Sequence, residues 1–177
     1  MGAHVVEDSR LNPSSPGYVL RDIAPGGLVR VVVPGGLVRL PPATRVIVCE
    51  NPSVLEAATD ELIPDCPALI CTDGMPSNTA LDLVAGLAAA TDEITVRADI
   101  DDAGFVVVDQ LLTAAPAATT WRYDVGTYLG HLGMTITGHQ SVGMDTLRDL
   151  YEEHRVSIHE VALLTTLIDD LSHPRSW

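Results

Sequence analysis

The chain has 177 residues, enough for one domain with a buried core, and only 4% of them are aromatic, so that core must be mainly aliphatic. Acidic residues outnumber basic ones by 24 to 10, the formal net charge is -14, and every basic residue is arginine. The lack of lysine excludes a Walker A loop and Schiff-base catalysis. The negative charge predicts repulsion of nucleic acid unless a metal or a partner reverses it locally.

Neither a membrane segment nor a secretion signal is recognisable in the sequence. No apolar run reaches the roughly 18 residues that a membrane helix needs, and the opening MGAHVVEDSR lacks the basic-then-apolar order of a signal peptide. We therefore expect a cytoplasmic protein that does not enter a membrane. The three cysteines form no CxxC pair, and Cys49 and Cys71 close apolar runs, so we expect buried free thiols.

Residues 1–45 differ from the rest of the chain and are predicted to be an N-terminal extension, partly β-structure and partly linker. The pentapeptide GGLVR occurs there twice, at residues 26–30 and 35–39. Two β-rich runs separated by Pro34, Gly35 and Gly36 predict a hairpin or two edge strands around that turn.

From residue 46 to residue 177 the pattern predicts one α/β domain in which short apolar strands alternate with helices. Such alternation implies right-handed crossovers, and therefore a Rossmann-like, mainly parallel sheet with helices on both faces. The expected strands are 45–50, 67–74, 93–101 and a shorter one at 119–124, and the expected helices are 51–62, 77–92, 103–115, 146–156 and 158–171.

Acidic residues follow three of these strands, at the edge where α/β sheets bind ligands. Glu50 ends the first strand and Asp73 follows the second, while Asp99 and Asp101 end the third. Alternate residues of an extended chain point to the same side, so the two aspartates should point together. If the first and third strands are neighbours, Glu50 joins them. Like charges so close indicate either a solvated turn or a cation site.

Five blocks of the sequence, in order, resemble a known family. They are VCENPSVLEAA, LICTDGMPSNTALDLVAGLAA, RADIDDAGF, WRYDVGTYL and HEVALLTTLIDDL. They resemble the conserved blocks of TOPRIM proteins, and among these the nuclease subunits of Wadjet-type plasmid-defence systems, which work beside condensin-like SMC complexes. The resemblance spans residues 46–171 and implies a TOPRIM fold.

The resemblance also implies an activity, a metal and partners. Glu50 matches the TOPRIM glutamate, and Asp99 and Asp101 match its Asp-x-Asp pair. All three are implied as catalytic residues and as ligands of Mg²⁺ (or Mn²⁺) in a DNA endonuclease that hydrolyses phosphodiesters for anti-plasmid defence. The implied partners are DNA, a protein that helps to hold it, and an SMC-like complex; a homodimer is compatible with this reading.

The Asp-x-Asp loop departs from the family pattern. That block usually reads like His-Gly-Asp-Phe-Asp-Trp-Pro-Gly, whereas this chain lacks the Trp-Pro pair and has Asp102 and Ala103 before Gly104. The alternative function is therefore a catalytically degenerate TOPRIM module that serves as a partner-binding subunit.

Four further residues are secondary candidates for the site. Asp73 is a turn residue or a ligand, and Asp102 is expected to cap a helix. Arg122 could contact phosphate or pair with an acid. Glu160 lies in HEVAL, which resembles a zinc-binding helix but has leucine where the second histidine should stand, so zinc is not expected.

Other polar residues of the last two helices are interpreted as solvent-facing. This applies to His154, His159, Asp169 and Asp170, while Trp121 is expected to be a packing anchor.

Overall fold

The structure is a computed structural model that describes residues 45–62, 66–89, 91, 93–134 and 143–173, together with the backbone of three N-terminal strands. Its elements in chain order are β1 (His4–Val6), β2 (Gly17–Ala24), β3 (Gly27–Pro34), β4 (Arg45–Cys49), α1 (Pro52–Leu62), β5 (Ala68–Cys71), α2 (Asn78–Ala88), β6 (Glu93–Val96), α3 (Asp102–Ala114), β7 (Thr119–Thr120), α4 (Val125–His131), α5 (Met144–His154), the 3₁₀ helix η1 (Glu160–Leu163) and α6 (Leu164–Ser172).

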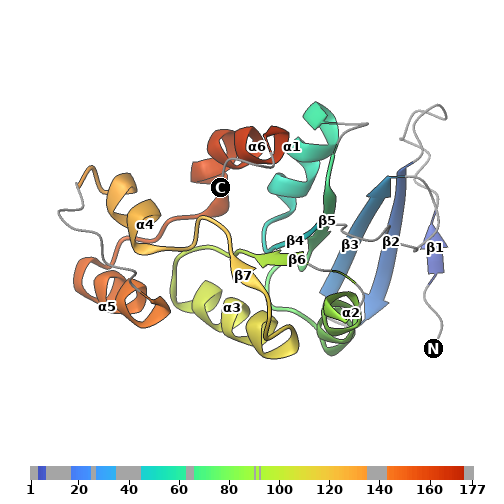
Figure 1. Cartoon of the computed structure of the whole chain (residues 1–177), viewed down its shortest axis with the longest axis horizontal. Helices are drawn as coiled ribbons and strands as arrows, with labels where there is room; N and C mark the ends of the chain where they lie inside the picture. The colour runs from blue at the N-terminus through green and yellow to red at the C-terminus, as the bar shows by residue number, and fades with distance from the viewer. Residues whose placement is uncertain are drawn as a thin grey trace.

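The strands form one sheet in the order β1-β2-β3-β5-β4-β6-β7. The four strands β5, β4, β6 and β7 are parallel, and the first of them in sequence, β4, lies between β5 and β6. Figure 1 shows α1 and α6 on one side of this sheet and α2 and α3 on the other. The predicted α/β fold, a Rossmann-like parallel sheet with helices on both faces, is confirmed for these strands (Figure 1).

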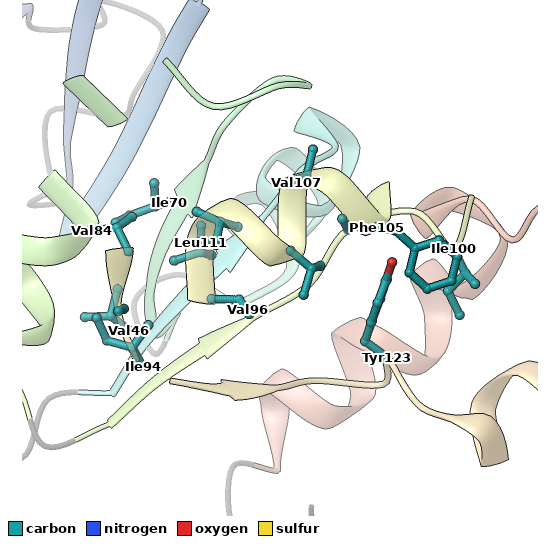
Figure 2. Packing of buried hydrophobic residues seen from close by; sticks show 14 of the residues in the cluster. Val46, Ile70, Val84, Ile94, Val96, Ile100, Phe105, Val107, Leu111 and Tyr123 are labelled. Carbon is teal, nitrogen blue, oxygen red and sulfur yellow. The ribbon is translucent and has the colours of Figure 1, made fainter. Parts of the chain in front are cut away.

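Two hydrophobic layers hold the helices against the sheet. Alternate strand residues such as Val46 and Val48 pack with α2, α3 and α5, and the intervening Ile47 and Cys49 pack with α1 and α6. Figure 2 shows the first layer, which is mainly aliphatic around Phe105, as the low aromatic content predicts. Each fully buried aliphatic side chain contributes about 1.5–3 kcal/mol, so both layers stabilise the packing of the helices on the sheet.

The N-terminal strands extend the sheet on the β5 side. β3 pairs antiparallel with β5, opposite its residues 69–71, and β2 and β1 follow outward, also antiparallel. A hairpin joins β2 to β3, with Ala24 opposite Gly27. The hairpin or two edge strands predicted around Pro34 to Gly36 stay a prediction, because residues 35–39 lie outside the described residues. The division of the chain at residue 45 stays a prediction.

Two local predictions are corrected in the C-terminal half, and one helix there was not predicted. The predicted helix 158–171 is broken, because Ile158 forms an antiparallel bridge with Ile100 before η1 begins. Helix α4 was not predicted. The cap of α3 is Asp101 and not Asp102, because the Asp101 side chain accepts a hydrogen bond from the backbone N–H of Gly104.

The three cysteines, Cys49, Cys66 and Cys71, are buried free thiols, as predicted. Among the described residues, no helix combines the length and apolar character needed to cross a membrane.

Candidate metal site at the carboxyl edge of the sheet

The ends of β4 and β6 bring Glu50 and Asp99 together. The two strands are parallel neighbours, and their pairing continues past β6 through a hydrogen bond of 2.8 Å from the Arg97 N–H to the Val48 carbonyl. Two residues later, the backbone N–H of Asp99 donates to Glu50 Oε2 at 3.1 Å. The acids that end the first and third parallel strands therefore lie side by side, and the peptide group of one orients the carboxylate of the other.

Asp101 is fixed by the start of α3. It is extended (φ -157°, ψ -178°), and its Oδ1 accepts the Gly104 N–H at 2.8 Å. A Cβ on Gly104 would lie 1.7 Å from the Asp99 carbonyl oxygen, so only glycine allows the first turn of α3 to pack this closely on the aspartate loop. The loop is shaped by that contact without the Trp-Pro pair of the TOPRIM pattern.

His159 completes a cluster that the sequence analysis did not predict. Its Nδ1 lies 2.7 Å from Asp99 Oδ2, and the backbone N–H of the next residue, Glu160, donates to Asp99 Oδ1 at 2.6 Å. One potential ligand atom each from Asp99, Asp101 and His159 lie within 4.8 Å of one another. The segment before η1 thus places the His159 imidazole beside the carboxylates of Asp99 and Asp101.

A buried ion pair supports this arrangement from the α1 and α6 side. Arg97 and Glu160 are both fully buried, with Arg97 Nε 3.4 Å from Glu160 Oε1. Glu160 Oε2 accepts the backbone N–H of Asn51, and Arg97 Nη1 donates to the Arg122 carbonyl at 2.6 Å. Glu160 therefore contacts both strand ends, because its side chain accepts from Asn51, the residue after Glu50, and its backbone N–H donates to Asp99. Breaking such a pair on one side typically costs about 3–5 kcal/mol.

Burial and like charge alter the proton affinities of the site. Burial is the main cause that raises the pKa of Glu50, and the charges of Asp99 and Asp101 raise it further. The hydrogen bond from His159 to Asp99 raises the pKa of the imidazole. Burial also raises the pKa of Glu160 well above its usual range, although Arg97 opposes that shift. Glu50 and Glu160 therefore retain a proton more readily than isolated carboxylates do.

The residues present fit a divalent cation. Two carboxylates and an imidazole within 4.8 Å of one another are ordinary ligands of such ions. Tyr123 gives an independent indication: it is 2% exposed, and its hydroxyl has no hydrogen-bond partner within the described part of the chain. Burial and then the charges of Asp101 and Glu50 raise its pKa, and Figure 2 shows the hydroxyl pointing toward the start of α3. A buried donor without a partner costs about 1–3 kcal/mol, so a ligand oxygen there would be stabilising.

Three of the secondary candidates lie outside this cluster. Asp73 is exposed in a left-handed turn (φ 54°) after β5. Asp102 faces solvent, 3.8 Å from Arg155. Arg122 donates two hydrogen bonds of 2.7 Å to Asp170, which leaves its guanidinium engaged with an acid.

Several expected solvent-facing or metal-binding roles are therefore revised. Glu160 is a buried support behind the cluster. Asp170 is buried, because it also accepts the indole N–H of Trp121 at 3.0 Å, and its predicted place on a solvated face is wrong. His159 is exposed, as predicted, but it contacts Asp99. The one sequence signal for His159 was its place beside Glu160 in a block of the TOPRIM resemblance.

Comparisons with known proteins give the family. A family model described as "Protein of unknown function C-terminus (DUF2399)" matches residues 29–171. The chain belongs to the DUF2399 family. The match begins within β3, so the family region includes at least part of the N-terminal strands as well as the parallel sheet. Among curated proteins, no match was found.

Two solved structures from bacteriophage T7 have some likeness to this DUF2399 chain. One is the lagging-strand DNA polymerase interacting with primase domains of two gp4 subunits bound to an RNA/DNA hybrid and dTTP. The sequence identity is 11% and the TM-score 0.32, and the match covers 81% of this chain and 84% of that one. The other is the primase fragment of the primase-helicase protein: 12% identity, TM-score 0.33, coverage 78% and 66%. Likeness at this level does not identify a shared activity.

Proposed function

We propose that this DUF2399 chain is a divalent-metal-dependent nuclease that hydrolyses DNA phosphodiesters. The observation that carries the proposal is the cluster of Asp99, Asp101 and His159 beside Glu50, at the sheet edge where α/β folds bind ligands. The resemblance to TOPRIM nucleases supports the same chemistry, because Glu50, Asp99 and Asp101 are the residues that match the TOPRIM motif.

Asp99 and Asp101 would hold the ion, Mg²⁺ or Mn²⁺, and each is already oriented by a backbone N–H. When bound, such an ion neutralises phosphate charge and lowers the pKa of its water. Glu50 is suited to take the proton of the attacking water. Its Oε2 is held by the Asp99 N–H, and burial raises its pKa, which makes the carboxylate a stronger base.

DNA binding by this part of the chain would need help. All five arginines of residues 45–173 pair with an acid: Arg45, Arg97, Arg122, Arg148 and Arg155. Together with a net charge of -14, this leaves little positive surface among the described residues to attract phosphates. We therefore propose that a partner protein positions the DNA. The TOPRIM resemblance favours an SMC-like complex in plasmid defence as that partner.

The same observation favours a second candidate, a degenerate module that serves as a partner-binding subunit. In that case the acids would still bind a metal, because their geometry is intact, but no cleavage would follow even with a partner present. The Asp-x-Asp loop without its Trp-Pro pair and with the added Asp102 also supports this candidate.

Plasmid cleavage tests the proposal. The wild type is incubated with supercoiled plasmid and Mg²⁺ or Mn²⁺, and nicked and linear products are measured beside metal binding by calorimetry. Asp99→Asn should abolish cleavage and weaken metal binding. Asp60→Ala, an exposed acid in the last turn of α1, is the matched control and should change neither. Metal binding without cleavage, even after the partner that positions the DNA is added, supports the degenerate module. No metal binding contradicts both candidates.

A further inference from the structure

We propose that His159 is itself a metal-binding residue, and that it makes the site select a first-row transition ion such as Mn²⁺ over Mg²⁺. The proposal rests on the metal site of the proposed function. It goes beyond that site because the acids alone would form an all-oxygen ligand set, which suits Mg²⁺ and Mn²⁺ alike.

The position of His159 is set by the fold. Ile158 pairs with Ile100 through two backbone hydrogen bonds of 2.9 and 3.1 Å, and the side chain of Glu160 is fully buried. The residue between them is therefore fixed at both ends. Its side chain is 57% exposed, but its Nδ1 still lies 2.7 Å from Asp99 Oδ2.

The contacts of Asp99 leave one oxygen directed at the imidazole. Oδ1 accepts the Glu160 N–H, so Oδ2 is the oxygen that faces His159 Nδ1. Asp101 contributes a further ligand atom within 4.8 Å of both. A cation at this point would take the place of the proton that Nδ1 and Oδ2 share.

The buried hydroxyl of Tyr123 is an observation independent of the histidine. It has no partner among the described residues, and it is electrostatically coupled first to Asp101 and then to Glu50. Among the described residues no acceptor serves this buried donor, and the oxygen of a hydrated ion bound near Asp101 would satisfy it.

Ligand chemistry then gives the preference for the ion. Mg²⁺ is small and hard and favours oxygen ligands and its own waters. Imidazole nitrogen suits transition ions, which bind such sites in the order Mn²⁺ < Fe²⁺ < Co²⁺ < Ni²⁺ < Cu²⁺. A set of two carboxylates and one imidazole should therefore bind Mn²⁺ more tightly than Mg²⁺.

The test compares the wild type with His159→Gln, using the full chain and Mn²⁺ or Mg²⁺ alone as the probe. Calorimetry should give Mn²⁺ binding at least about tenfold tighter than Mg²⁺ in the wild type. His159→Gln should lose at least about tenfold in Mn²⁺ affinity, the lower end of what even an outer-shell metal partner contributes, and little in Mg²⁺ affinity. Electron spin echo spectroscopy of bound Mn²⁺ should show coupling to a nitrogen in the wild type and none in the variant. His131→Gln, an exposed histidine of α4, is the control and should retain that coupling.

Two results would overturn the proposal while leaving the metal site in place. One is bound Mn²⁺ without nitrogen coupling in the wild type, and the other is equal affinity for both ions that His159→Gln does not alter. In both, His159 only pairs with Asp99. Asp99→Asn separates this failure from that of the proposed function, because it should remove binding of both ions if the metal site exists. A wild type that binds neither ion contradicts both proposals.

Discussion

Asp101 has two roles that substitution can separate. Its Oδ1 caps α3 through the Gly104 N–H, and its charge belongs to the metal cluster. Asparagine caps helices about as well as aspartate but lacks the charge, whereas alanine does neither. Asp101→Asn should therefore keep the stability of the metal-free protein, and Asp101→Ala should lose about 1 kcal/mol, within the typical cost of roughly 0.5–2 kcal/mol.

The expected shifts in melting temperature are measurable. For a chain of 177 residues, 1 kcal/mol corresponds to about 2–4 °C, so in EDTA only Asp101→Ala should melt lower. With Mn²⁺ at about 100 times its Kd, binding adds about 2.7 kcal/mol, which is about 5–11 °C for the wild type. Both Asp101 variants should lose most of that increase.

Asp124 provides the matched control for the capping effect. It caps α4 in the same way, through a hydrogen bond of 2.9 Å from the Thr127 N–H, and it is outside the cluster. Asp124→Ala should lower the melting temperature in EDTA and leave the Mn²⁺ increase unchanged. The reasoning is refuted if Asp101→Asn melts as low as Asp101→Ala in EDTA, or if it keeps the full increase with Mn²⁺.

Three further predictions test the support of the site by thermal or chemical unfolding. Gly104→Ala should destabilise the protein strongly, because the added Cβ would lie 1.7 Å from the Asp99 backbone oxygen. The control Gly86→Ala in α2 has open space around it and should stabilise the protein by up to about 1 kcal/mol. Equal effects of the two substitutions would contradict the close packing on Asp99. Arg97→Met alone should lower the free energy of unfolding by about 3–5 kcal/mol, because it leaves the Glu160 charge buried without its partner. Adding Glu160→Gln should recover part of this loss. If the two substitutions are simply additive, the coupling between the residues is disproved. Burial would raise the pKa of Asp170, but its hydrogen bonds from arginine and tryptophan outweigh this and lower it. Asp170→Asn should therefore destabilise above pH 3.8, the ordinary pKa, and the difference from wild type should shrink as the pH falls through the lowered value; a difference independent of pH would contradict the ion pair.

The sequence predicted those parts of the fold that depend on local pattern. Continuous apolar runs gave the positions of β4, β5 and β6, and the helical pattern of residues 77–92 gave α2, which Ser77 caps in the structure. Glu50 was expected to lie beside Asp99 only if β4 and β6 are neighbours. The sequence does not show this, and the sheet order satisfies it.

What the sequence could not give depends on contacts between distant segments. The bridge from Ile158 to Ile100 breaks a periodic apolar stretch that otherwise predicts one continuous helix, and so it turns His159 toward Asp99. Asp170 is buried only because Trp121 and Arg122 meet it from β7's end of the sheet. No local signal distinguishes these residues from ordinary solvent-facing positions of a helix.

The central claim is that Asp99 and Asp101 share a divalent ion at the carboxyl edge of the sheet. The most direct test is anomalous X-ray diffraction from crystals of the full chain grown with Mn²⁺. The structure predicts a manganese peak in contact with both carboxylates and with His159, and no peak there in Asp99→Asn crystals. A wild-type structure with manganese elsewhere, or with none at these residues at saturating Mn²⁺, would contradict the claim.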